Sequence, residues 1–378
     1  MEIDDLGLYR VFDSRADETV AASVNGVTAA APAGASRGTH EAASFVPDDL
    51  ESIEATIRDH CIGDSFDQAS FDDLLEDIDG TDQFANIGSV AIALSLAFRK
   101  ATEANEGKTF PYPLGNVVGG GEHGGNTAIQ EFLLLPIEAQ SFEEAARTNA
   151  RIYDDLKEQY ARKISGINDE GALITTMDDE QTLQAVTSVA SDHGARVGLD
   201  VAGNELWTGE VYEYSEMGLR LSPKEQQAFM EDLIDRFDLA YVEDPFHEDD
   251  FRHHKDLQDN VNDTLIVGDD LYATNAARLR GDGPMCDGTI IKPNQAGTVT
   301  RTREAISVCR DAETVPIISH RSGETCDPSI SMMALMDTIP IIKAGITDIR
   351  VAKLNWLRRQ WQKTESSSMA SVPISGGE

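Results

Sequence analysis

Short apolar runs that end on a chemically active side chain recur through the second half of the chain. The runs are VGLD, AYVE, LIVGD, TIIK, IISH and IIK, and they close on Asp200, Glu243, Asp269, Lys292, His320 and Lys343. From position 243 onward the ends lie at 269, 292, 320 and 343, in steps of 26, 23, 28 and 23 residues. One strand, one helix and two loops have this length, so the pattern predicts a β/α barrel. Because barrels carry their chemistry at the carboxyl ends of the strands, we expect these side chains to converge on one mouth.

The first hundred residues follow a different pattern. Residues 8–13 and 19–24 read as strands, and Asn25-Gly26 is a favoured hairpin turn into a third strand. Acidic helical stretches follow, together with the apolar segment SVAIALSLAFRKA at residues 89–101. The predicted fold class is therefore α/β, with an α+β amino-terminal domain followed by a β/α barrel.

The best candidate for the domain boundary is the segment GKTFPYPLGN at residues 107–116, which has two prolines between two glycines. We therefore predict an amino-terminal capping domain at residues 1–107 and a catalytic barrel at residues 108–362. Residues 363–378, KTESSSMASVPISGGE, are expected to form a flexible, solvated tail.

The charge balance limits the possible partners. The formal net charge is −36, from 67 acidic and 31 basic residues, which opposes binding to nucleic acid or to an anionic membrane. A small anionic substrate would need a local basic pocket. The acidic excess is dispersed along the chain, which is typical of a halophilic protein kept soluble in a salt-rich cytosol. A disordered acidic chain is excluded because 40% of the residues are hydrophobic and strands are readable.

The cysteines and the apolar runs indicate a cytoplasmic protein. The four cysteines have no C-x-x-C spacing and are expected to be buried, reduced thiols: Cys61, Cys286, Cys309 and Cys326. The amino terminus lacks an apolar signal core, and no run approaches 18 apolar residues.

Three acids at strand ends form a candidate metal site. Asp200, Glu243 and Asp269 offer hard oxygen ligands, which suit Mg²⁺ and leave coordination positions for substrate and water. A single strand-end acid is more often a loop acid or a helix cap, but three acids on successive strands with basic partners favour a metal. Asp244 and Asp270, next to them in the sequence, would then support the ligands.

Two lysines end apolar strands in the same half of the chain. Burial and neighbouring cations at Lys292 would lower its pKa and let it act as a base, whereas a lone lysine there would more often reach out to solvent. Lys343 interrupts PIIKAG in the same way. Two lysines facing three carboxylates suggest mutual neutralisation as well as catalysis.

Further polar groups lie in two motifs. SHRSGE at residues 319–324 offers an arginine fork that suits phosphate, with a serine hydroxyl as a second donor. The glycine-rich GGGEHGGN at residues 119–126 is expected to lack a preceding strand and a following helix, so it favours close backbone approach to a ligand over dinucleotide binding. On local sequence alone, Glu131 and Glu170 are equally well read as site residues or as surface charges.

Taken together, these segments closely resemble enolase, the phosphopyruvate hydratase family of glycolysis. The resemblance extends from DSR at residues 13–15 to VAKLN at residues 351–355, and includes GASRG, NVVGGGEH, IQEF, DEG, GLDVA, VEDPF, GDDL, IKPNQAGT and SHRSGET in that order. It implies a lyase that reversibly dehydrates 2-phosphoglycerate, a small phosphorylated carboxylate, to phosphoenolpyruvate. It also implies two Mg²⁺ ions per active site and a homodimer or higher oligomer.

The resemblance implies a role for each site residue. Asp200, Glu243 and Asp269 would bind the first Mg²⁺, and Ser36 the second. Lys292 would take the proton from C2, and Glu170, aided by Glu131, would protonate the departing C3 hydroxyl. The other residues expected to bind the substrate are Lys343 at its carboxylate and, around its phosphate side, His123, Gln130, His320, Arg321 and Ser322.

The sequence also departs from the family pattern. This chain has DSRADET where the family has DSRGNPT, AGASR where it has SGAST, and DEGALIT where it has DEGGFAP. All three segments are loops that should close over substrate. One alternative is therefore a catalytically weak enolase-like protein with a binding or regulatory role, although the retained acids and lysines argue against it. The other is a related acid dehydratase or racemase, for which Arg321 with Ser322 would have no phosphate to bind.

Overall fold

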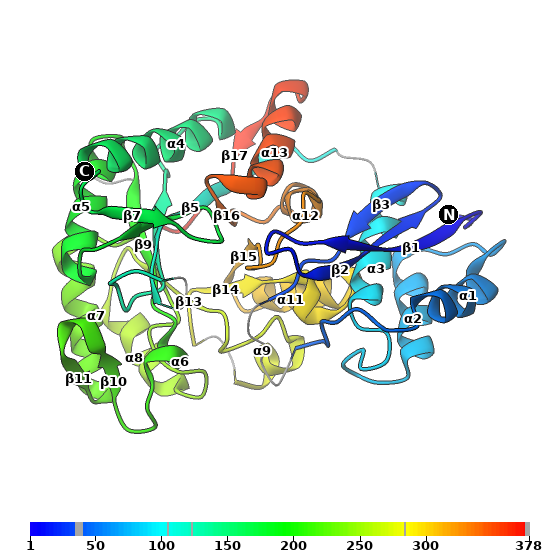
Figure 1. The fold of residues 1–378 in the computed structure, drawn as a ribbon, viewed down its shortest axis with the longest axis horizontal. Coiled ribbons are helices and arrows are strands. Elements are labelled where there is room, and N and C mark those ends of the chain that lie inside the picture. The colour runs from blue at the N-terminus through cyan, green and yellow to red at the C-terminus, as the bar shows by residue number, and fades with distance from the viewer. Residues whose placement is uncertain (35–40, 104–105, 122–123, 283–284, 375–378) are drawn as a thin grey trace.

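The computed structural model describes residues 1–34, 41–103, 106–121, 124–282 and 285–374. In these residues a small antiparallel sheet with three helices lies beside a closed barrel, with the barrel at the left of Figure 1. The predicted fold class, an α+β amino-terminal domain followed by a β/α barrel, is confirmed. The predicted boundary after residue 107 falls between the last helix of the small domain and the first strand of the barrel region.

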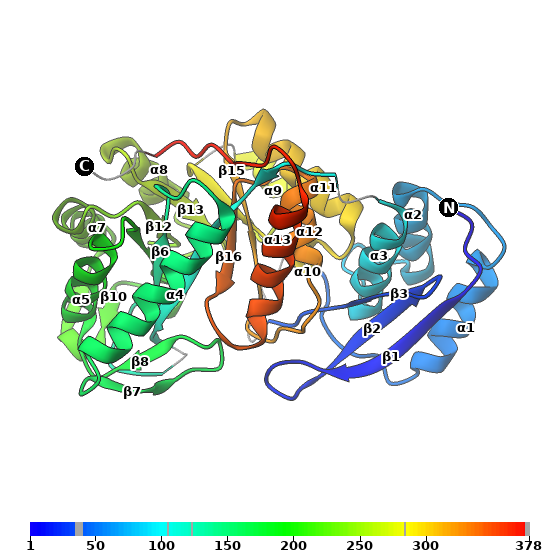
Figure 2. The same ribbon diagram turned by 90° about the horizontal axis from the view of Figure 1, so that it is seen from above.

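The amino-terminal sheet has the strand order β1-β2-β3. Its elements are β1 (Leu6–Phe12), β2 (Glu18–Val24), β3 (Val27–Ala30), α1 (Leu50–Cys61), α2 (Gln68–Asp79) and α3 (Ser89–Thr102). Asn25 and Gly26 join β2 to β3 with φ angles of 49° and 78°, the left-handed backbone that a two-residue hairpin turn requires. Helix α3 is apolar along most of its length and packs on β2 and β3, as Figure 2 shows.

Eight strands close the barrel among the residues that the structure describes. They are β5 (Tyr112–Gly119), β6 (Glu131–Leu135), β9 (Arg196–Asp200), β12 (Tyr241–Glu243), β13 (Leu265–Gly268), β14 (Gly288–Ile291), β15 (Val315–Ser319) and β16 (Ile341–Gly345). All six strands predicted from the apolar runs are present. Strand β6 runs antiparallel to β5 and β9, and the parallel pairing of β16 with β5 closes the ring.

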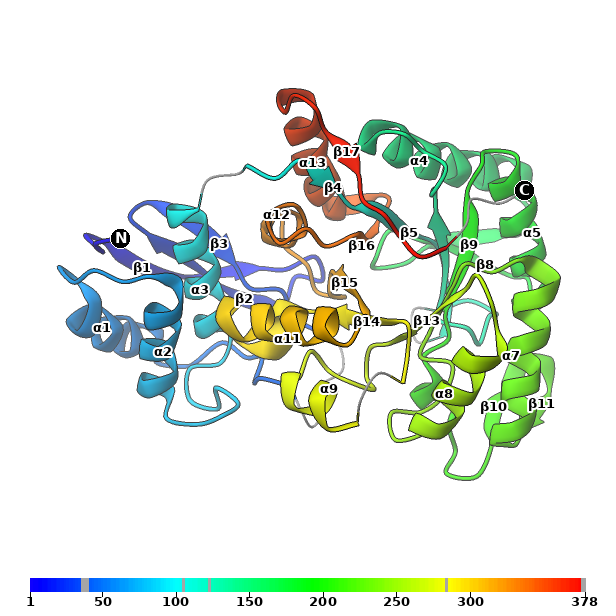
Figure 3. The same cartoon turned by 180° about the vertical axis from the view of Figure 1, so that it is seen from behind.

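Helices surround the barrel on its outer face (Figure 3). They are α4 (Phe142–Gln159), α5 (Asp179–Ser191), α7 (Pro223–Phe237), α8 (Phe251–Asn260), α9 (Ala276–Asp282), α11 (Val299–Asp311), α12 (Ser329–Met336) and α13 (Val351–Lys363). Shorter elements join them: β4 (Thr109–Phe110), β7 (Ile164–Ile167), β8 (Leu173–Thr175), α6 (Gly203–Leu206), β10 (Tyr212–Tyr214), β11 (Leu219–Leu221), α10 (Pro293–Ala296) and β17 (Ser368–Met369).

The alternation of side chains along the strands explains why the polar groups reach the mouth. Tyr241 and Ile341 point into the barrel, where they belong to a buried apolar cluster separate from the one under the helices. Two residues further along the same strands, Glu243 and Lys343 therefore point inward too, at the open end. The interior is filled by apolar side chains below and by polar ones at the mouth.

The amino-terminal domain is attached to the barrel through the start of α11. Asp72 on α2 accepts hydrogen bonds from the backbone nitrogen of Thr300 at 2.8 Å and from its hydroxyl at 2.6 Å. A carboxylate is favourable there because the first amides of a helix lack partners and carry partial positive charge. Arg301 adds a two-pronged ion pair to Glu76, at 2.7 and 2.9 Å. These contacts fix the small domain beside the mouth.

Part of the predicted solvated tail is structured. Strand β17 pairs with β4, and the backbone nitrogen of Ala370 donates to the carbonyl of Phe110 at 2.8 Å. Val372 and Ile374 pack against the apolar cluster inside the barrel. The expectation failed because a few apolar residues within a polar segment are enough to cover the open apolar end of a barrel.

Two smaller expectations also need correction. The thiol of Cys326 is exposed, whereas Cys61, Cys286 and Cys309 are buried as expected. Strand β5 ends at Gly119, so the glycine-rich loop does follow a strand, contrary to expectation. Because β6 is the next strand or α-helix among the residues that the structure describes, the strand-loop-helix geometry of a dinucleotide-binding turn is not formed there.

Potassium chloride in the molar range is expected to stabilise the fold. The net charge of −36 produces self-repulsion, which fades as the screening length falls from about 10 Å at about 0.1 M salt to about 3 Å at about 1 M. The thermal unfolding midpoint, followed by circular dichroism, should therefore rise with KCl. Glycine betaine at equal osmolality is the control, since it does not screen charge. A midpoint that stays flat or falls in KCl would contradict the prediction.

Candidate active site at the barrel mouth

The ammonium of Lys343 lies among three carboxylates, which we call the carboxylate cluster: Glu131, Asp200 and Glu243. The distances from Nζ to the nearest carboxylate oxygens are 2.8, 2.7 and 2.8 Å, and each side chain is at most 8% exposed. Burial alone would lower the pKa of Lys343, but the carboxylates raise it well above its ordinary value. Burial, followed by the charge of Asp200, raises the pKa of Glu243. One ammonium cannot balance three carboxylates, so the cluster attracts further positive charge.

The three predicted metal ligands stand on adjacent strands. Glu243 is directly opposite Asp200 in the pairing of β12 with β9, and Asp269 follows the neighbouring strand β13. Among the residues that the structure describes, Glu243 Oε1 and Asp269 Oδ1 are buried without a hydrogen-bond partner. Buried carboxylate oxygens without donors are costly unless a cation binds them. Hard oxygen donors of this kind fit a divalent cation such as Mg²⁺.

Two neighbouring acids support this arrangement. Asp244 accepts hydrogen bonds from the backbone nitrogens of Asp269 at 2.9 Å and of Asp270 at 3.0 Å. Oxygens of these three residues lie within 4.8 Å of one another. Since both oxygens of Asp244 already accept from the backbone, its role is to hold the loop after β13 in place.

Lys292, just after strand β14, forms an ion pair with Asp269 at the end of the neighbouring strand β13. The expectation that its pKa would be lowered is wrong for this structure. Burial does act in that direction, but the nearby charge of Asp269 outweighs it, and the pKa of Lys292 is raised.

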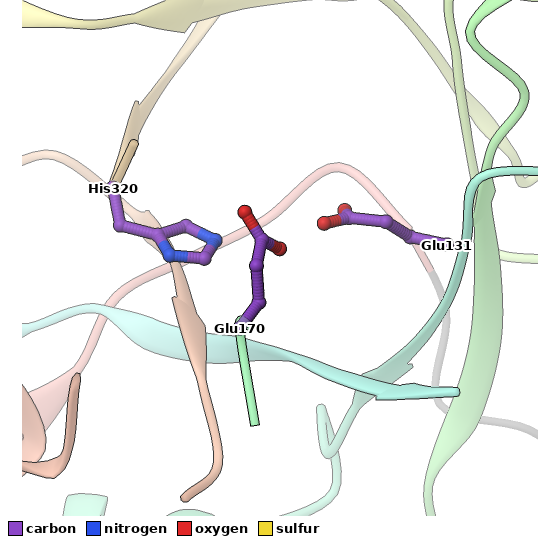
Figure 4. A group of neighbouring side chains, drawn as sticks. All are labelled: Glu131, Glu170 and His320. Atoms are coloured by element: carbon purple, nitrogen blue, oxygen red, sulfur yellow. The ribbon is translucent and has the colours of Figure 1, made fainter. Parts of the chain in front are cut away.

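Glu131, Glu170 and His320 form a second group, which we call the acid-base cluster. Their side chains point toward one another from β6, from the turn before β8 and from the end of β15, as Figure 4 shows. All three are buried, and one ligand atom from each lies within 4.8 Å of the others. Asn116 donates to Glu131 Oε1 at 2.9 Å and to Glu170 Oε2 at 3.4 Å. Both glutamates therefore belong to the mouth and are not surface charges.

The guanidinium of Arg321 is held from several sides at the entrance of the mouth. Its Nη1 lies 3.2 Å from the carboxylate of Glu41, and a side chain at Gly34 would lie only 1.8 Å from its Nη2. Gly34 and Glu41 come from the amino-terminal domain, so that domain helps to orient the arginine. Ser322, next in the chain, accepts a hydrogen bond from Arg15 at 3.2 Å.

Of the three remaining predicted residues, Gln130 is the one that the structure describes. Gln130 donates its backbone nitrogen to the carbonyl of Asp200 at 3.1 Å, so it stands beside the carboxylate cluster. Ser36 and His123 lie outside the described residues. Ala33 pairs with Gly323 through two backbone hydrogen bonds of 2.8 Å.

The sequence reasoning missed three residues that shape this site. Asn116 could have been found, because it is a polar residue inside the otherwise apolar, fully buried strand YPLGNVVG. Glu41 and Arg350 have no such local signal. Arg350, at the start of α13, is fully buried and binds both His320 and the turn that carries Glu170.

Comparisons with known proteins cover nearly the whole chain. The model of the enolase N-terminal domain matches residues 3–112, and that of the enolase C-terminal TIM barrel domain matches residues 107–370. Among curated proteins, an enolase of Archaeoglobus fulgidus is 40% identical, with 98% of this chain and 100% of that protein covered. Enolases of Natronomonas pharaonis and Halorubrum lacusprofundi are 39% and 40% identical, each with 94% of this chain and 98% of the relative covered.

Proposed function

Because the chain belongs to the enolase family, we propose that it catalyses the Mg²⁺-dependent, reversible dehydration of 2-phosphoglycerate to phosphoenolpyruvate. The observation that carries this proposal is the arrangement of the mouth. A partly buried lysine contacts a candidate metal ligand, and two buried glutamates and a histidine form a second group at the same mouth. Removal of a proton and loss of a hydroxyl from neighbouring carbons need a base and an acid placed in this way.

Asp200, Glu243 and Asp269 would hold the first ion, for which the two buried oxygens without hydrogen-bond partners are the support. Ser36 would contribute to the second. When bound, Mg²⁺ supplies positive charge that stabilises the negative charge developing on the substrate carboxylate as C2 loses its proton.

Lys292 would remove the C2 proton, and the electron pair of the broken C–H bond would first be delocalised onto the substrate carboxylate. That pair would then form the C2–C3 double bond as the C3–O bond breaks and the hydroxyl leaves. Glu170, assisted by Glu131, would supply the proton that converts that hydroxyl into water. Both glutamates are buried at the mouth, and Asn116 donates a hydrogen bond to an oxygen of each.

The cationic side chains would bind the anionic ends of the substrate. Lys343 would neutralise the substrate carboxylate, and Arg321 with Ser322 and His123 would bind the phosphate. His320 and Gln130 would line the space between them. The position of Arg321 supports this role, because its guanidinium is buried and held in place by groups from both domains.

The cellular setting is also part of the proposal. The surface of β1 exposes Tyr9 and Phe12, which are 51% and 69% accessible, and such apolar side chains support assembly into a homodimer or higher oligomer. We propose a cytoplasmic location, because a glycolytic lyase must share a compartment with its substrate. Within the described residues, every helix is too short or too polar to cross a bilayer.

The direct test is the formation of phosphoenolpyruvate from 2-phosphoglycerate with Mg²⁺ in high KCl, followed by absorbance. Asp269→Asn should lower kcat by at least about 100-fold, because the bound ion contributes several kcal/mol and each ~1.4 kcal/mol is a factor of ten. Excess chelator should have the same effect on the parent. Asp77→Asn, an exposed acid on α2, is the matched control.

The affinity for Mg²⁺ provides a second measurement that does not depend on turnover. Titration calorimetry should show weaker Mg²⁺ binding by Asp269→Asn than by the parent or the control variant. Full activity in excess chelator would exclude the metal role. Tight binding of 2-phosphoglycerate without any turnover by the parent would instead favour a binding protein.

A further inference from the structure

Arg350 is a fully buried cation whose hydrogen bonds reach two parts of the candidate site. A guanidinium has five N–H donors and no acceptor. Its Nε donates to His320 Nδ1 at 2.8 Å, and its Nη1 to the Asp169 carbonyl at 3.2 Å and the Asp348 carboxylate at 3.0 Å. Its Nη2 donates to the carbonyls of Arg321 at 3.2 Å and Ser322 at 2.7 Å. Every donor of the side chain is therefore used.

The chain around Arg350 is shaped to admit it. A side chain at Gly345 would lie 2.6 Å from Arg350 Cδ and 2.9 Å from the carbonyl oxygen of Glu170. Only a glycine at that position lets the arginine stem pass so close to the turn that carries Glu170. The side chain thus ties the end of β16 to this turn and to the segment after β15.

The contact with His320 decides where the imidazole carries its proton. Because Arg350 can only donate, His320 Nδ1 must be the acceptor. Burial, followed by the nearby charge of Arg350, lowers the pKa of His320 well below its ordinary value, so the ring is neutral. A neutral imidazole that accepts at Nδ1 carries its hydrogen on Nε2.

The other edge of the ring faces the glutamates. Figure 4 shows the imidazole turned toward Glu170, with Glu131 beyond it. In the proposed reaction Glu170 gives up its proton, so negative charge develops on its carboxylate. An N–H donor aimed at that charge stabilises the transition state, whereas a nitrogen lone pair at the same place would repel it.

We propose that Arg350 is a positioning residue that fixes His320 as the Nε2–H tautomer and so presents a hydrogen-bond donor to Glu170 during loss of the C3 hydroxyl. The effect on catalysis rests on the function proposed above. The tautomer does not, since it follows from the contact between Arg350 and His320 alone.

Nitrogen NMR of the parent protein tests the tautomer directly. With ¹⁵N-labelled histidine and arginine, His320 should show a protonated Nε2, an unprotonated Nδ1 and a scalar coupling from Nδ1 to an arginine Nε across the hydrogen bond. The signal is assigned by its loss in His320→Asn. A proton on Nδ1 of His320, or an imidazolium, would overturn the proposal whether or not any variant folds.

Substitution then tests the consequence. Arg350→Met keeps the length of the side chain without a donor, and Arg350→Lys keeps the charge without the fork. Arg350→Met should populate the Nδ1–H tautomer and lower the dehydration rate by at least about 100-fold, while exchange of the C2 proton changes only by a few fold. Arg350→Lys, whose ammonium can still donate to Nδ1, should retain part of the Nε2–H tautomer and part of the rate. Arg99→Lys, an equally buried arginine that pairs with Asp337 far from the mouth, is the control and should leave the ratio of the two rates unchanged.

The outcomes separate this proposal from the function itself. If Arg350→Met keeps the Nε2–H tautomer and the parental ratio of dehydration to exchange, Arg350 has no positioning role. If the parent does not convert 2-phosphoglycerate, the proposed function fails, and the spectrum of the parent still decides the tautomer.

Discussion

Replacement of Lys343 by alanine is expected to lower the free energy of unfolding by about 3–5 kcal/mol, the cost of removing one partner from a buried ion pair. The ammonium is bound at 2.7–2.8 Å to three carboxylates that have almost no access to water. Without it, these groups must either take up protons or repel one another. Turnover should be lost as well, because the substrate carboxylate would meet uncompensated negative charge.

Urea unfolding at fixed, high KCl measures the stability, and turnover of 2-phosphoglycerate measures the activity. Lys363→Ala, at the exposed end of α13, removes a lysine without touching the carboxylate cluster and should change neither quantity. Lys343→Met keeps the volume of the side chain, so a similar loss in this variant assigns the effect to charge and not to a cavity. If Lys343→Ala unfolds within about 1 kcal/mol of the parent, the ammonium does not hold the cluster together.

Lys292→Ala and Glu170→Gln are expected to separate the two halves of the reaction. The first should abolish exchange of the C2 proton with solvent and lower kcat by about 10³-fold or more, within the range that a general base provides. The second should block departure of the hydroxyl to a similar extent but keep part of the exchange, because the base is intact. Deuterium exchange at C2 followed by NMR, beside the rate of phosphoenolpyruvate formation, measures both.

Lys157→Ala, an exposed lysine on α4, serves as the control for lysine removal. Because Lys292→Ala removes one partner of the ion pair with Asp269 and is expected to lower stability, both active-site variants are compared with the parent under conditions in which circular dichroism shows each of them to be folded. Equal loss of exchange in both variants would show that the roles of base and acid are wrongly assigned.

Much of the barrel could be predicted from the sequence, because its strands are short and apolar and each ends at a polar residue. The runs ending at Asp200, Glu243 and Lys343 became β9, β12 and β16, and the inward alternation of each strand delivers its last polar residue to the mouth. Periodicity therefore located the candidate site residues that end these runs, and the Asn25-Gly26 turn located the hairpin between β2 and β3.

The remainder depended on contacts that no single stretch of sequence encodes. Glu131 stands at the start of its strand and not at the end, because β6 runs against its neighbours. The raised pKa of Lys292 depends on its contact with Asp269, 23 residues earlier in the chain. Arg350 meets His320 only after α12 and β16 have folded back on the barrel. A local sequence pattern predicts which way a side chain points, but not which charged group it will contact.

The pairing of β16 with β5 has a consequence for folding during synthesis on the ribosome. Ile341 lies opposite Tyr112, so the ring closes only when residues more than two hundred positions apart in the sequence meet. Lys343 is delivered by that last strand, and until it leaves the ribosome the carboxylate cluster has no cation from the chain. A nascent barrel would have two open sheet edges, which invite pairing with other chains. Closure of the ring and neutralisation of the site by the chain are therefore one event, which waits for the synthesis of β16.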